Sequence, residues 1–138
     1  MASVVRRVLT KQEKVSEILK CGRDPQYFIN KYVMIQHPVQ GRIPFKTFDF
    51  QNDILKNIEE HRFNIVLKSR QLGLSTVGAA YAAWFALFHK DKNVLVIATK
   101  LPTAINFIKK VKVALTNVPE WLIMGSFDTN KQSVTFSN

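Results

Sequence analysis

The segment spanning residues 63–88 constrains the fold most, because it joins an apolar run, a loop with one glycine and an apolar helix. The run "FNIVL" (63–67) favours extended structure and has the length of a buried parallel strand. From Ser75 onward, apolar side chains return every three or four positions, which predicts a helix. The intervening loop "KSRQLGLST" (68–76) therefore lies at a junction of strand and helix, where phosphate-binding loops are found.

A second strand and helix follow in the same order. The run "NVLVIAT" (93–99) reads as another buried strand, and Pro102 opens a helix with an apolar face. Strand, helix, strand and helix in succession predict an α/β fold with a parallel sheet and right-handed crossovers. The last residues, "SVTFSN", alternate like an edge strand or the first arm of a hairpin.

The first half of the chain reads mainly as helix. We predict a short helix over Lys11–Leu19 that breaks at Cys21-Gly22, and a second helix capped by Asp24 and opened by Pro25. Extended chain with turns at His37-Pro38 and Gln40-Gly41 comes next. Apolar residues four positions apart then predict a helix over residues 49–61, with Asp49 near its cap.

Composition narrows the class of protein. The chain has 138 residues, the size of one domain or part of one, and 46% of them are hydrophobic, which is enough for a core. Its net charge of +10 favours a polyanionic partner such as nucleic acid or nucleotide. The single cysteine, Cys21, fits an intracellular setting, and we find no signal peptide or membrane-spanning segment.

The loop at 68–76 contains most of the parts of a phosphate site. Gly73 can supply the tight turn, the helix that follows supplies its N-terminus, and Ser75, with Thr76 beside it, can supply a magnesium hydroxyl. Leu74 stands where a lysine is usual, so we assign the phosphate cation to Lys68 first and Arg70 second. A plain strand-to-helix turn with an ordinary glycine explains the loop alone equally well.

The loop and its neighbours together resemble a known family. "KSRQLGLST" is similar to the deviant Walker A loop of the large terminase subunits of T4-like tailed phages, the ATP-driven motors that package DNA. "DPQYFINKYVMIQHP", "FDFQNDIL", "LVIATKLPTA" and "LTNVPEWL" resemble further segments of that family, in the same order. The likeness covers roughly residues 20–138.

The resemblance implies a nucleotide site that uses ATP and Mg²⁺. Phe50-Gln51 matches the family's adenine-binding pair, since a glutamine amide can donate to and accept from adenine while an aromatic ring, Phe48 or Phe50, stacks on it. The implied nucleotide-binding residues are Gln51, Phe50, Gln71, Gly73, Leu74, Ser75 and Thr76. Lys100, Lys109 and Lys110 are candidates for DNA contact. A solvated helix face is the simpler interpretation of the cluster Lys109, Lys110 and Lys112, and a solvated loop lysine that of Lys100.

The implied fold is a P-loop NTPase of the RecA-like (ASCE) kind, a parallel sheet with flanking helices. Residues 1–24 would form a helical lead-in and residues 25–138 a partial ATPase domain, truncated before the Walker B strand and without the nuclease domain. No run of apolar residues ends in the Asp-Glu pair that hydrolysis needs. The resemblance implies a motor in the cytoplasm of the infected host, in which several copies of the chain could form a homo-oligomer. Its partners would be double-stranded DNA, the portal protein and the small terminase subunit.

Two other classes stay open. A superfamily 2 helicase-like or restriction-type DNA translocase shares the order of glutamine motif, phosphate loop and following strand. A basic DNA-binding or assembly module without catalytic activity would also account for the charge. Nucleotide dependence of DNA binding separates this last class from the others.

Overall fold

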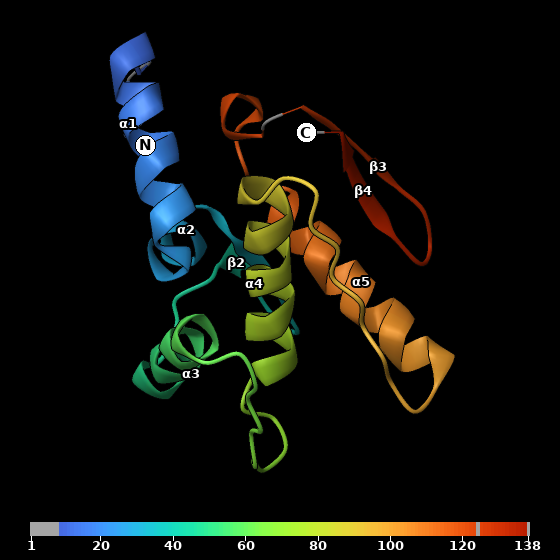
Figure 1. The fold of residues 1–138 in the computed structure, drawn as a ribbon. Coiled ribbons are helices and arrows are strands. Elements are labelled where there is room, and N and C mark those ends of the chain that lie inside the picture. The colour runs from blue at the N-terminus through green and yellow to red at the C-terminus, as the bar shows by residue number, and fades with distance from the viewer. Residues whose placement is uncertain (1–8, 124, 138) are drawn as a thin grey trace.

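The computed structural model describes residues 9–123 and 125–137 and is mainly helical (Figure 1). The elements, in chain order, are α1 (Lys11–Arg23), α2 (Pro25–Tyr32), β1 (Met34–His37), β2 (Gly41–Pro44), α3 (Asp49–Glu60), α4 (Leu74–Phe88), α5 (Leu101–Leu115), the 3₁₀ helix η1 (Glu120–Leu122), β3 (Ser126–Thr129) and β4 (Val134–Ser137).

Helix α4 forms the centre of the core. Figure 1 shows it between α1, α2 and α3 on one side and α5 on the other. Its alanines at 79, 80 and 83 are buried and let neighbouring helices approach closely, while Trp84 and Leu87 add large buried side chains to the core. The Trp84 indole donates a 2.7 Å hydrogen bond to the Cys21 carbonyl, which fixes α4 against the last turn of α1.

The predicted helices α2, α3, α4 and α5 are all present. Asp24 caps α2 by accepting from the Tyr27 N–H at 2.9 Å, with Pro25 in the first turn, as the sequence indicated. The predicted break at Cys21-Gly22 is wrong, because α1 continues to Arg23. Gly22 serves packing instead: a Cβ there would lie 3.4 Å from the Phe88 ring.

A buried carboxylate joins α1 to α2. Glu17 accepts hydrogen bonds from the hydroxyls of Tyr27 (2.9 Å) and Tyr32 (2.8 Å) and pairs with the Lys31 ammonium at 2.5 Å. Burial raises the pKa of Glu17, but the hydrogen bonds from Lys31, Tyr32 and Tyr27 outweigh it and leave the pKa below its ordinary value. Glu17 is therefore a charged and fully partnered link between the two helices.

The predicted parallel sheet is wrong, and with it the P-loop NTPase fold class. Within residues 9–123 and 125–137 the strands form two separate antiparallel pairs, β1 with β2 and β3 with β4. Segments 63–67 and 93–99 form neither helix nor strand, and Ile65 and Leu67 are fully exposed. An apolar, β-prone run becomes a strand only where a neighbouring strand satisfies its backbone, and here no described strand does so.

The C-terminal hairpin differs in one respect from its prediction. Within that run, Val134–Ser137 form a strand, β4, but as the second arm of a hairpin whose first arm, β3, precedes it. Phe127 on β3 lies directly opposite Phe136 on β4, with ring centroids 5.6 Å apart. This cross-strand aromatic pair stabilises the hairpin.

Candidate functional site

The loop between segment 63–67 and α4 turns sharply at two places. Gln71 and Gly73 both have left-handed backbone conformations, with φ of 64° and 71°. The second is the N-cap of α4, and glycine adopts this conformation without the steric cost that other residues have. Gly73 thus brings the loop directly onto the first turn of α4, as the sequence indicated.

The first turn of α4 offers backbone donors to an anion. The Gly73 carbonyl accepts from the N–H groups of Thr76 and Val77, and no side chain caps the helix. The amides of Leu74 and Ser75 precede these and lie at the positive end of the helix dipole. Ser75 is exposed there, so its hydroxyl could take part in a magnesium site, and Thr76 is partly buried beside it.

Gln51 connects the loop to α3. Its side-chain nitrogen donates to the Leu72 carbonyl at 3.0 Å, and its side-chain oxygen accepts from the Phe48 N–H at 3.1 Å. The residue is only 2% exposed. In this arrangement the amide that the resemblance assigns to adenine holds the loop instead, and reading a base would require these bonds to exchange.

Two aromatic rings are exposed at the start of α3, beside Gln51. Phe48 and Phe50 stack with ring planes 7° apart and centroids at 5.9 Å, and they are 66% and 40% exposed. Large exposed rings next to a polar loop are suited to stacking on a nucleobase. The structure therefore brings the predicted aromatic residues and the predicted phosphate loop to one region, joined by Gln51.

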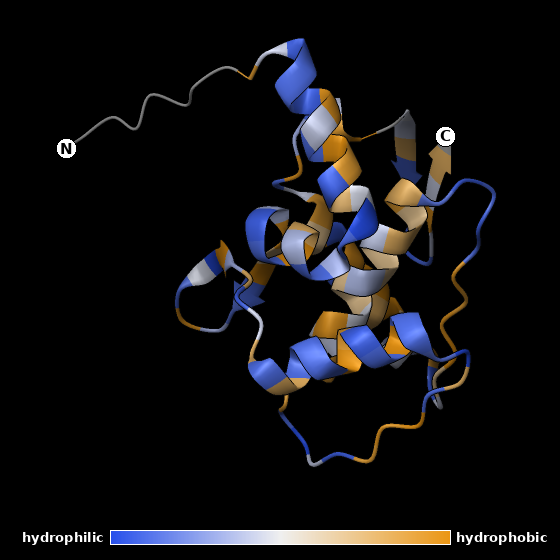
Figure 2. Ribbon diagram, turned by 60° about the vertical axis from the view of Figure 1, so that its left-hand side comes forward, coloured by the Kyte–Doolittle hydropathy of each residue, from blue (hydrophilic) through white to orange (hydrophobic). Residues whose placement is uncertain are grey.

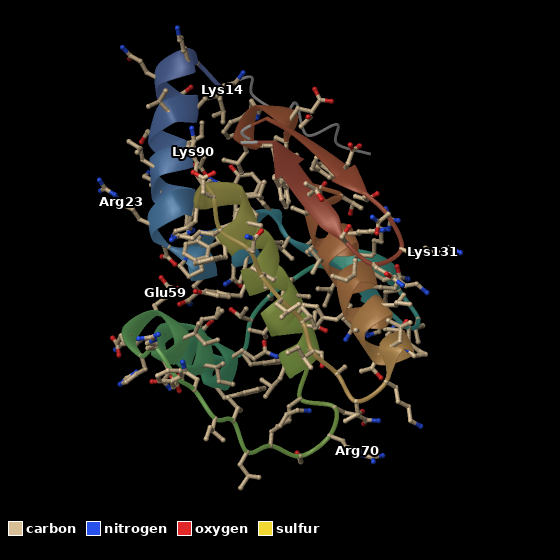
Figure 3. All side chains as sticks on the ribbon, turned by 45° about the vertical axis from the view of Figure 1, so that its right-hand side comes forward. Lys14, Arg23, Glu59, Arg70, Lys90 and Lys131 are labelled. Atoms are coloured by element: carbon tan, nitrogen blue, oxygen red, sulfur yellow. The ribbon has the colours of Figure 1, made fainter. Side chains whose placement is uncertain are left out.

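The two predicted phosphate cations lie on the outside of the loop. Lys68 and Arg70 are both exposed, and the Lys68 ammonium donates to the neighbouring Ser69 carbonyl at 3.2 Å. Figure 3 shows Arg70 at the tip of the loop, with its guanidinium directed away from the protein. Neither side chain is fixed by the fold, so either can turn toward a ligand.

A third cation reaches the loop region from α5. Lys110 donates from its ammonium to the Thr76 hydroxyl at 3.3 Å, which places a positive charge at the first turn of α4. Thr76, Lys109 and Lys110 also line a pocket of about 260 Å³ beside β1. Sequence reasoning placed Lys110 among DNA-contact candidates, and no local pattern could reveal its contact with a residue 34 positions away.

The three lysines suggested for DNA do not form one cluster. Lys100 is the N-cap residue of α5, whereas Lys109 and Lys110 lie in its third turn, roughly 14 Å further along the helix axis. Lys100 directly follows segment 93–99, which the sequence predicted to be a strand of the parallel sheet; that segment is not a strand, so Lys100 does not lie at the edge of such a sheet. Lys109 and Lys110 lie on the same side of α5 as the first turn of α4.

Within the part of the chain that the structure describes, no three His, Cys, Asp or Glu side chains come together as a metal site. None of the described helices has both the length and the apolar character needed to cross a membrane. No protein-family model matches the chain.

Proposed function

We propose that loop 68–76 binds the phosphates of ATP with Mg²⁺, and that the chain is the ATP-binding part of a phage terminase large subunit. The observation that carries the proposal is the hydrogen bond from the Gln51 amide to the Leu72 carbonyl, 3.0 Å long. It joins the aromatic-glutamine motif to the glycine loop across 21 positions of sequence. These are two of the motifs by which the chain resembles terminases.

Each part of the ligand has a group to meet it. The phosphates face the backbone donors of the first turn of α4, where Gly73 shapes the approach and Ser75 offers a hydroxyl to Mg²⁺. The exposed stacked pair of Phe48 and Phe50 takes the base. The residues present fit the nucleotide without the parallel sheet, because the site depends on the loop, the helix end and the Gln51 contact.

The cations would complete the site from two directions. Lys68 and Arg70 lie on the loop itself, and Lys110 approaches from α5 through Thr76. Bound Mg²⁺ would supply charge neutralisation of the phosphates. We keep Lys68 as the first choice and Arg70 as the second, and Lys110 joins them as a cation held near the helix end.

The partners follow from charge and from the resemblance. The net charge of +10 supports double-stranded DNA as the polymer that the complete motor moves. The portal protein, the small terminase subunit, a homo-oligomeric motor and the cytoplasm of an infected bacterium are proposed on the resemblance alone. A basic module without nucleotide chemistry would bind DNA equally well with and without ATP.

Titration with a fluorescent ATP analogue and Mg²⁺ tests the proposal. We expect Lys68→Ala to weaken binding about tenfold or more, because a hydrogen bond to a charged group contributes about 1.5–3 kcal/mol. Lys131→Ala is the matched control, since Lys131 is an exposed lysine in the β3–β4 turn. Equal effects of the two substitutions would refute a specific site, and abolition of binding by Arg70→Ala alone would reverse the order of the two cations.

A further inference from the structure

A groove of about 780 Å³ with an apolar floor lies between segment 91–96 and the β3–β4 hairpin. One wall is segment 91–96 and the other is residues 132–136, which include most of β4. The floor consists of apolar side chains of α4 and α5, among them Ala82, Ile105 and Ile108. In Figure 1 segment 89–100 runs along α4 and α5, with the hairpin on the far side of α5.

Both walls present backbone groups that no described residue pairs with, the first from a segment without helix or strand and the second from the free edge of β4. No backbone hydrogen bond joins segment 93–97 to any other described residue, and β4 pairs only with β3, along one of its two edges. Extended backbone with unpaired N–H and C=O groups is a template for an added strand. The groove therefore offers main-chain pairing at its sides and apolar contact at its floor.

The apolar side chains of the first wall are exposed. Val94 and Leu95 are 46% and 83% exposed, and Figure 2 shows the apolar colour of this segment at the surface of the protein. Exposed contiguous apolar residues of this kind mark interaction sites in soluble proteins. Segment 63–67 is equally exposed, but it does not line this groove.

The surroundings of the groove are basic. Lys90 precedes the first wall, Lys92 lies in it, Lys100 follows it and Lys131 precedes the second. These four lysines outnumber the two neighbouring carboxylates, Asp91 in the first wall and Asp128, which lies opposite Thr135 in the hairpin. A ligand that enters the groove with carboxylates at its ends would neutralise these charges. A second copy of the chain is disfavoured, because each copy has a net charge of +10.

We propose that this groove binds a separate partner polypeptide as an added β-strand, with an apolar centre and Asp or Glu residues at its ends. The walls supply backbone pairing, the floor selects the apolar centre, and the lysines select the acidic ends. The inference is independent of nucleotide binding, because none of the groove residues belongs to loop 68–76.

Fluorescence anisotropy with a short labelled peptide tests it. The peptide has a centre of Val and Ile and Asp residues at both ends, and the comparison peptides have Lys at the ends or N-methylated backbone in the centre. We expect the first peptide to bind about tenfold more tightly than either comparison peptide. Amide hydrogen exchange should slow at residues 93–97 and 134–136 when it binds.

Two leucines make a matched pair of variants. Leu95→Ser removes an apolar side chain from the groove, and Leu67→Ser makes the same change at a fully exposed leucine outside it. We expect a loss of about tenfold in peptide affinity for Leu95→Ser and no change for Leu67→Ser. Equal losses, equal binding of all three peptides, or no protection at the two walls would overturn the proposal. A dimer of the free chain that Leu95→Ser dissociates would overturn it in favour of a second copy.

Discussion

Replacement of Gly73 by alanine tests how closely the loop is held against α3. Gly73 has φ of 71°, a left-handed conformation that costs an alanine about 1–2 kcal/mol. The added Cβ would also lie 3.0 Å from the side-chain nitrogen of Gln51. Because Gln51 is buried, displacing it weakens the bond to the Leu72 carbonyl and adds about 1–2 kcal/mol. We expect a total loss of about 2–4 kcal/mol in the free energy of unfolding.

Gly41 provides the control within the same chain. Its φ is 72°, nearly the same as that of Gly73, but an added Cβ would meet no atom within 4 Å. Gly41→Ala should therefore cost only the conformational term, about 1–2 kcal/mol. The difference between the two variants then measures the contact between Gly73 and Gln51.

Urea unfolding followed by tryptophan fluorescence is the assay, because Trp84 is buried in the core and reports its exposure. A double-mutant cycle with Gln51→Ala should remove the excess loss at Gly73, since the displaced side chain is then absent. Equal losses for Gly73→Ala and Gly41→Ala, or an excess that persists in the Gln51→Ala background, would refute the reasoning.

Three further predictions concern the helices around the site. Hydrogen bonding holds the pKa of Glu17 below its ordinary value of 4.5, so the free energy of unfolding should be constant at neutral pH and fall as the pH drops through the lowered pKa. Urea unfolding measured across pH should show a flatter dependence for Glu17→Gln. The same pH dependence in both proteins would contradict this assignment. Burial raises the pKa of the Cys21 thiol to about 12, so thiol reagents should react only on unfolding, and rapid labelling of the native protein would count against the packing of α1. Tyr81→Phe removes the 2.5 Å hydrogen bond to Glu59 that joins α4 to α3 and should cost about 1 kcal/mol, whereas an unchanged urea midpoint would show that the bond contributes nothing.

The helices could be predicted from the sequence because their signals are local. Asp24 and Pro25 mark the start of α2, and the apolar spacing after Ser75 marks α4, without reference to distant residues. The strands could not be predicted in this way. Runs 63–67 and 93–99 have strand composition, but pairing depends on partners elsewhere, and none of the described strands pairs with them.

In the candidate site, too, features set by local sequence could be predicted and contacts between distant residues could not. Gly73 was predictable from its place before a helix, whereas the bond between Gln51 and Leu72 spans 21 positions and that between Lys110 and Thr76 spans 34. Such contacts are set by the packing of α3 and α5 against α4, which leaves no local pattern in the sequence. The resemblance brought Gln51 to attention for adenine, and only the structure shows that it holds the loop.

Amide NMR of the chain titrated with Mg²⁺ and ATP is the most direct measurement of nucleotide binding at loop 68–76. We predict saturable shifts of the Gly73, Leu74 and Ser75 amides, which lie at the N-terminal end of α4 that we propose binds the phosphates. Adenosine, which lacks phosphates, should leave these three amides unchanged, and Gln51→Ala should weaken the response to ATP. Shifts spread over the basic surface without saturation at these amides, or no shift there at all, would contradict the proposal that this loop is a nucleotide site.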